Sequence, residues 1–163
     1  WGETEQIADA TQAKRSLYAR LKASLPLSSP PQTLLFDAFF EGFRSAVPNL
    51  PALLPEVWLH WDPRTVKERG PEALLRFRMD FLLLLPQGVR VVIEVDGKHH
   101  YADANGSADV QRYAQMVKAD RELKLAGYEV FRFGAAELQV PTAKADVKTF
   151  FEALFKRYGV PTT

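Results

Sequence analysis

The sequence predicts one mixed α/β domain, in which a central mixed sheet is flanked by helices and preceded by an extra N-terminal helix. Three observations lead to this fold class. The 163 residues are 47% hydrophobic and 25% charged, which is typical of one globular domain. Strand-like runs of Val, Ile and Leu alternate with segments of helical periodicity. Neither an internal repeat nor a low-complexity tract interrupts this order.

Two helices are expected before the first strand. Residues 2–24 are rich in helix formers but carry only a thin apolar stripe, which predicts a mostly exposed helix. We therefore divide the chain into residues 1–26, a helix and candidate linker from a preceding region, and the main domain at 27–163. The Ser29-Pro30 step favours the start of a second helix at 32–46, whose Phe-rich face belongs in the core.

Four strands and two further helices follow. Strand-like composition is found at residues 56–61, 74–85, 89–96 and 129–133. We expect Trp58 and Trp61 of the first strand to pack in the core or at the sheet edge. Asp109 is a natural N-cap for a helix that reaches Ala126 and stops at Gly127. A last amphipathic helix runs from residue 143 or 144 to 158.

The tripeptide Pro86-Gln87-Gly88 predicts a three-residue hairpin loop, formed by a type I turn and a left-handed Gly88. Such a loop pairs Leu85 with Val89 and places Asp80 directly opposite Glu94. A two-residue loop would move Asp80 to the other face of the sheet. With the three-residue loop, acidic and basic side chains lie together on one face of the sheet: Asp80, Glu94, Asp96 and Lys98, with Arg76 and Arg78 further along.

This set of charges predicts a metal site. Carboxylates are costly to bury, and three close together repel one another unless a cation lies between them. Oxygen ligands alone suit Mg²⁺ or Mn²⁺ better than Zn²⁺. We therefore expect Asp80, Glu94 and Asp96 to bind metal, with either Glu94 or Asp96 as the principal ligand. Lys98 would position a water or neutralise charge on a phosphate, as in a metal-dependent phosphodiesterase. The alternative is a solvated sheet face with cross-strand ion pairs.

The supporting residues leave alternatives open. His100 is a candidate substrate contact or acid–base group, or an ordinary loop histidine. Asp120 either points at the site or pairs with Lys124 or Arg121. Basic side chains form a candidate phosphate-binding surface, with a plain solvated face as the alternative: Arg64, Lys67, Arg69, Arg76 and Arg78.

Composition excludes several classes of protein. The absence of Cys excludes disulfides and thiolate metal sites, and makes a cytoplasmic location the default expectation. Because no apolar run approaches roughly 20 residues, no membrane partner is expected. The net charge of +1 means that nucleic-acid binding must come from a local basic surface.

The motif as a whole resembles the PD-(D/E)XK nuclease superfamily. Asp80 matches its first acid, and Asp96-Gly97-Lys98 matches its tripeptide. The finer pattern is similar to the branch related to very-short-patch-repair endonucleases: an acid-x-Asp-Gly-x-x-His strand at 94–100, then Asp120, Leu123 and Gly127, then Arg132-Phe133. The resemblance spans residues 29–138. The resemblance implies a restriction-endonuclease-like core and cleavage of DNA that depends on a divalent metal ion. At the level of the family, it also implies a role in a defence or restriction system.

One departure from the family pattern affects the expected activity. The family often has a Glu that assists the metal at the position of Gln32, so Glu41 or Asp37 would have to substitute, or the metal site is weaker. This motivates two alternatives: a catalytically silent nuclease-like module that binds nucleic acid or protein, and an RNA-cleaving effector. DNA is the expected partner, with RNA, a second copy of the chain, or a covalently linked upstream domain as further candidates.

Overall fold

The computed structural model describes residues 5, 8–46, 50–58, 78–103 and 106–161, and the account below concerns these residues. Their helices are α1 (Ala10–Ala23), α2 (Pro30–Gly42), α5 (Val110–Leu125) and α6 (Ala143–Arg157). Their strands are β1 (Ala52–Trp58), β2 (Arg78–Leu84), β3 (Arg90–Asp96) and β4 (Tyr128–Gly134). Short 3₁₀ turns cover Arg44–Ala46, Pro86–Gly88, Lys98–His100 and Glu137–Gln139.

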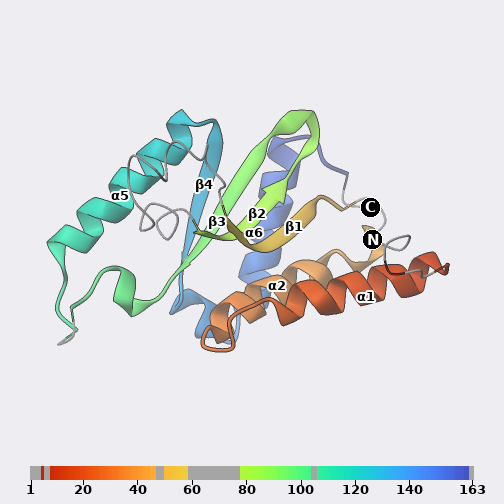
Figure 1. The fold of residues 1–163 in the computed structure, drawn as a ribbon, viewed down its shortest axis with the longest axis horizontal. Helices are drawn as coiled ribbons and strands as arrows, with labels where there is room; N and C mark the ends of the chain where they lie inside the picture. The colour runs from red at the N-terminus through yellow and green to blue at the C-terminus, as the bar shows by residue number, and fades with distance from the viewer. Residues whose placement is uncertain (1–4, 6–7, 47–49, 59–77, 104–105, 162–163) are drawn as a thin grey trace.

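The four strands form one open mixed sheet in the order β1-β2-β3-β4. β1, β2 and β3 pair antiparallel, whereas β3 and β4 pair parallel and are connected through α5 (Figure 1). The expected mixed α/β class is therefore confirmed. None of the described helices is long and apolar enough to cross a membrane.

Two apolar clusters cover the two faces of the sheet. The larger cluster joins the sheet to α2 and α6, and its buried rings include Phe36, Phe39, Phe81, Phe151 and Phe155. The smaller cluster contains Met79, Val92 and Leu123, and Leu123 comes from α5. The predicted core helix is confirmed, because Phe39 of the Phe-rich face of α2 makes edge-to-face contacts with Phe151 and Phe155 of α6. The sheet is thus held rigidly between helices on both sides.

The hairpin between β2 and β3 has the predicted length and register. Leu85 N donates to Val89 O at 2.9 Å, and Phe81 pairs with Ile93. The predicted turn type is wrong, since Gln87 as well as Gly88 lies at positive φ (61° and 76°). Two consecutive left-handed residues match the right-handed twist of a hairpin, which explains why Gln87 adopts a conformation that is costly outside glycine.

The element boundaries differ from the prediction mainly at β1. This strand begins at Ala52 rather than at residue 56, and it includes Pro55, which an edge strand tolerates because one side of it needs no N–H donor. The predicted strand residues 59–61 and 74–77 lie outside the described part of the chain. In contrast, the predicted ends of α5 are confirmed: Asp109 Oδ1 accepts from Gln111 N at 2.9 Å, and Gly127 has a φ of 83°.

Helix α1 is tied to α2, as Figure 1 shows. Tyr18 stacks on Phe36 with ring centroids 5.4 Å apart, and its hydroxyl donates to Asp37 at 2.9 Å. Lys22 Nζ lies 2.8 Å from the same carboxylate. Burial, together with Asp37, raises the pKa of the Tyr18 phenol to about 12. This helix therefore packs through Tyr18, although most of its other side chains are exposed.

This contact makes a first prediction. Tyr18→Phe should lower the free energy of unfolding by about 1 kcal/mol, because the ring packing stays and one hydrogen bond to a charged group is lost. Urea denaturation measures the change. Tyr113→Phe, on an exposed part of α5, is the matched control and should leave stability unaltered. Equal stability of native protein and Tyr18→Phe would contradict the role given to this hydroxyl.

Candidate functional site

A cavity of about 910 Å³ lies where the C-terminal end of β3 approaches the start of α2. Residues from both helical layers and from all four strands line it. Six of the residues predicted from the sequence are among them: Gln32, Arg78, Asp80, Glu94, Lys98 and His100. The structure thus gathers most of the expected site around one opening.

Asp80 sits at an irregularity in the sheet. Regular pairing of β1 with β2 includes Pro55–Phe81 and resumes at Val57–Met79, and Glu56 and Asp80 lie between these pairs. Met79 packs on the α5 side whereas Phe81 packs on the opposite side, so the alternation of side chains is interrupted at Asp80. The buried Asp80 carboxylate accepts from Val95 N at 2.8 Å through Oδ2. This bond ties β2 to β3 next to Glu94.

Glu94 is the carboxyl group with the most perturbed environment in the cavity. The regular pairing of β2 with β3 ends at Phe81–Ile93, one residue before Asp80 and Glu94, and the Asp80 carboxylate lies near enough to act on the charge of Glu94. Desolvation by burial and then the nearby Asp80 raise the pKa of Glu94 to about 8, and Arg132 acts in the opposite direction. A carboxylic acid that still holds its proton near neutral pH is typical of a functional site.

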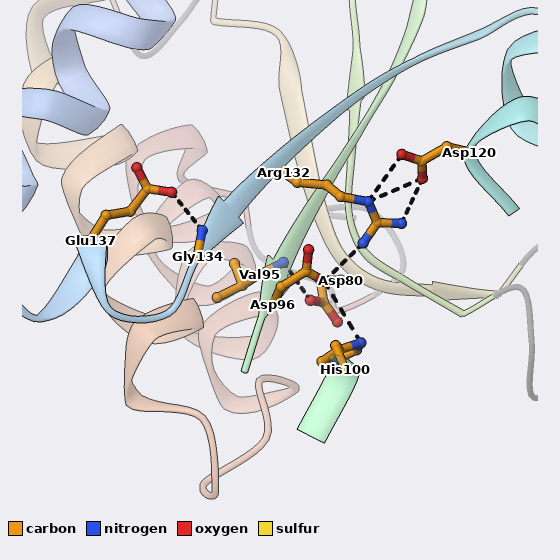
Figure 2. A network of polar contacts seen from close by, with 8 residues as sticks. All are labelled: Asp80, Val95, Asp96, His100, Asp120, Arg132, Gly134 and Glu137. Carbon is orange, nitrogen blue, oxygen red and sulfur yellow. Dashed lines mark hydrogen bonds and ion pairs between the residues drawn. The ribbon is translucent and has the colours of Figure 1, made fainter. Parts of the chain in front are cut away.

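Asp96 is engaged elsewhere. Its Oδ1 accepts from Arg132 Nη1 at 2.8 Å and lies 3.7 Å from His100 Nδ1 (Figure 2). Among the described residues, no group of three or more His, Asp or Glu side chains is arranged to hold a metal ion. The expected trio of Asp80, Glu94 and Asp96 is therefore not brought together as one set of ligands, because Arg132 binds the Asp96 carboxylate.

Arg132 belongs to the site, although the sequence analysis named it only as part of the Arg132-Phe133 motif and gave it no role. It lines the cavity from β4, and its guanidinium lies between Asp96 and Asp120 in Figure 2. Arg132 Nη2 donates to Asp120 Oδ1 at 2.6 Å, and Nε donates to both carboxylate oxygens at 3.0 and 3.2 Å. Asp120 is thus turned toward the site through Arg132, and not toward Lys124 or Arg121. A charged residue between Phe131 and Phe133 is the signal that marks this position in the sequence.

Lys98 and His100 are not on the strand. β3 ends at Asp96, as predicted, and Lys98–His100 form a 3₁₀ turn after Gly97. The strand alternation used to place Lys98 on one surface with Glu94 and Asp96 therefore does not extend to Lys98. The exposed Lys98 lines the cavity and lays its Nζ against Gly106, where an added Cβ would overlap it. Gly97 ends the regular pairing and lets the chain turn, which carries Lys98 to the rim.

Gln32 is the polar side chain of α2 at the cavity. It is only 4% exposed, and its Oε1 has no hydrogen-bond partner within the described residues. The two acids considered as substitutes are paired away from it: Asp37 with Tyr18 and Lys22, and Glu41 with Lys144 at 2.8 Å. An unpaired buried carbonyl oxygen is costly, so Gln32 is placed to accept from, or coordinate, a ligand that enters the cavity.

The basic surface is only partly described. Arg78 lines the cavity, as does Arg112, which the sequence reading did not single out. Arg64, Lys67, Arg69, Arg76 and Trp61 lie outside the described residues. Trp58 also lines the cavity and is 44% exposed, so it lies at the sheet edge rather than in the core, which is one of its two expected placements. β1 begins four residues earlier than predicted, and Trp58 is its last residue.

In comparisons with known proteins, no family model matches the chain, and no curated protein or solved structure shows significant similarity to it. The nuclease resemblance therefore has only the motif residues and the geometry above to support it.

Proposed function

We propose that this chain is a metal-dependent endonuclease domain that hydrolyses phosphodiester bonds, most readily in DNA, on a restriction-endonuclease-like core. The observation that supports the proposal best is the placement of Asp80, Glu94 and Gln32 in one cavity with Arg78 and Arg112, where the Gln32 Oε1 has no hydrogen-bond partner among the residues that the structure describes. Acidic oxygens for a cation and guanidinium groups for phosphates are the two requirements of such chemistry.

The side chains present fit a hard divalent cation. The candidate ligands are all oxygens: two carboxylates from neighbouring strands and the buried amide oxygen of Gln32, which lacks a partner in the described part of the chain. We assign Asp80, Glu94 and Gln32 to Mg²⁺ or Mn²⁺, with Glu94 rather than Asp96 as the principal ligand, because Arg132 holds Asp96. When bound, the ion would supply Lewis-acid polarisation of a phosphoryl oxygen and a lower pKa for water.

The remaining groups bind and orient the substrate. The Lys98 ammonium at the rim would neutralise charge that develops on the cleaved phosphate. His100, held 3.7 Å from Asp96 through Nδ1, would exchange a proton with the leaving or attacking oxygen at its Nε2. Arg132 would keep Asp96, and with it His100, in place.

A cleavage assay tests the proposal. Supercoiled plasmid and a single-stranded RNA of matched length are incubated with the protein and Mg²⁺ or Mn²⁺, with and without EDTA. We expect nicked and linear plasmid only when the metal is available, and slower cleavage of RNA. Intact plasmid and intact RNA, under conditions in which a control nuclease digests both, would refute the proposal. Cleavage of RNA alone would favour the effector alternative.

The engagement of Asp96 by Arg132 favours one second candidate, a silent module that binds nucleic acid without cutting it. Isothermal titration with Mn²⁺ separates the two. Metal binding that is lost in Asp80→Asn is expected of the nuclease, whereas retained DNA binding without detectable Mn²⁺ binding is expected of the silent module. A defence or restriction role and a cytoplasmic location are extensions of the same proposal.

A further inference from the structure

The last residue of β1 and the first residue of β2 place an aromatic ring and a guanidinium side by side. Trp58 pairs directly with Arg78, and both line the cavity. The Trp58 ring is 44% exposed, and the Arg78 side chain is 45% exposed. Glu56 and Asp80 lie two residues further along the same strands, which is about 7 Å away. A ring and a cation are therefore presented next to the proposed cleavage site.

Glu56 contacts the Arg78 guanidinium and does so at a local cost. It adopts a φ of 53° inside a strand, which is a strained conformation for a residue with a side chain. Its side chain is 14% exposed, its Oε2 lies 3.2 Å from Arg78 Nη1, and its Oε1 is buried without a partner among the described residues. Strain and an unsatisfied oxygen at the same residue indicate a position kept for function. The group that Glu56 holds in place is the Arg78 guanidinium.

The chemistry of this surface selects its ligand. An indole face stacks on any nucleobase, and an arginine binds phosphate oxygens. In a paired duplex both faces of a base are covered by its neighbours, so stacking on Trp58 requires an unpaired base. Two residues along a strand, about 7 Å, is a short enough separation for the ring and the acids to face the same stretch of an extended strand. The ring and the acids can thus contact neighbouring nucleotides of one single strand.

We propose that Trp58 and Arg78 form a subsite for an unpaired nucleobase and its phosphate adjacent to the cleaved bond, and that Glu56 is the positioning residue that holds Arg78. This inference rests on the proposed function and narrows it. The substrate is then nucleic acid that is single-stranded, or locally unpaired, at the cleavage site.

Binding without cleavage tests the subsite directly. The native protein in EDTA is titrated into a fluorescently labelled eight-nucleotide oligo-dT and into a blunt duplex of equal length, and anisotropy is recorded. Trp58→Leu should weaken binding of the single strand about tenfold, from the loss of one base stack, and change duplex binding by less than about twofold. Trp58→Phe retains a ring and should keep most of the affinity. Tyr113→Leu, an exposed aromatic on α5, is the control and should behave as native.

The positioning role of Glu56 needs a separate readout. Arg78→Gln should lower the salt dependence of single-strand binding by about one phosphate contact. Glu56→Gln should do the same in the native background but have no further effect when Arg78 is already Gln. Additive losses from the two substitutions would show that Glu56 acts only on the fold, and would overturn its role.

The outcomes separate this inference from the nuclease proposal. If Trp58→Leu keeps the native ratio of single-strand to duplex affinity, the subsite is refuted even when plasmid cleavage is observed. If metal-dependent cleavage fails on every substrate but Trp58→Leu still selectively loses single-strand binding, the subsite stands and the nuclease proposal falls. A circular dichroism spectrum equal to that of the native protein confirms that each variant is folded.

Discussion

Replacing Glu94 with Gln is expected to abolish metal-dependent cleavage and, in the same variant, to stabilise the metal-free protein at alkaline pH. An amide keeps the shape of the side chain but supplies no negative charge to the ion. Because a metal ion stabilises the transition state by several kcal/mol, we expect cleavage to fall at least about 100-fold. The gain in stability follows from the environment of Glu94 in the absence of metal.

The sign of the stability effect comes from the raised pKa. Desolvation, with Asp80 as the second cause, raises the pKa of Glu94 from 4.5 to about 8. Between these values the folded protein keeps a proton that the unfolded chain has lost. The contribution of Glu94 to stability is therefore complete below about pH 4.5 and is lost as the pH rises through 8. Gln has no proton to lose, so the advantage of Glu94→Gln should grow over this range, by on the order of 2–4 kcal/mol.

Urea denaturation in EDTA at pH 5, 7 and 9 measures this difference. Glu152→Gln, at an exposed position on α6, is the matched control and should follow the native protein at every pH. Added Mg²⁺ should raise the midpoint of the native protein more at pH 8 than at pH 6, and should not raise that of Glu94→Gln. Parallel curves for native protein and Glu94→Gln at all pH values would mean that the carboxyl group is not desolvated, and would remove the main electrostatic argument for the site.

Much of this architecture could be predicted from short sequence signals such as turn and helix-capping residues. The tripeptide Pro86-Gln87-Gly88 predicted the loop length, and the loop length predicted the register that pairs Phe81 with Ile93. Asp109 and Gly127 marked the ends of α5, because caps depend on one or two residues and their immediate neighbours. Predictions of this kind succeed because the physical cause lies within a few residues of its effect.

The predictions that failed depend on contacts between distant segments. Arg132 and Asp96 are 36 residues apart, and nothing in the local pattern of either strand shows that one neutralises the other. The break in pairing at Glu56 and Asp80 involves two strands that are far apart in sequence, so neither strand's local pattern predicts it. The predicted end of β3 at Asp96 is confirmed, but the 3₁₀ turn after Gly97 moves Lys98 off the strand, so Lys98 could not be placed from alternation alone.

The cluster of Asp96, Arg132 and Asp120 makes the second large prediction. Arg132→Met should lower the free energy of unfolding by about 3–5 kcal/mol at pH 8, because it leaves two partly buried carboxylates without their cation. The Asp96 and Asp120 side chains are only 11% and 22% exposed, so water cannot fully replace the guanidinium. Burial lowers the pKa of Arg132, but the hydrogen bond to Asp120 and the charges of Asp96, Asp120 and Glu94 outweigh it and hold this pKa above its usual range. Arg132 therefore stays charged beside these carboxylates.

A second variant distinguishes loss of an ion pair from loss of packing. If the cost of Arg132→Met comes from unpaired carboxylates, then adding Asp120→Leu should recover part of it, since one buried charge is removed together with its partner. Lowering the pH toward 5 should also reduce the cost, because the unpaired acids can then bind protons. Arg121→Met, an exposed arginine on α5, is the matched control and should cost less than about 0.5 kcal/mol. A cost for Arg132→Met that is independent of pH and undiminished by Asp120→Leu would assign the role of Arg132 to side-chain packing, and Asp96 would then be available to bind metal.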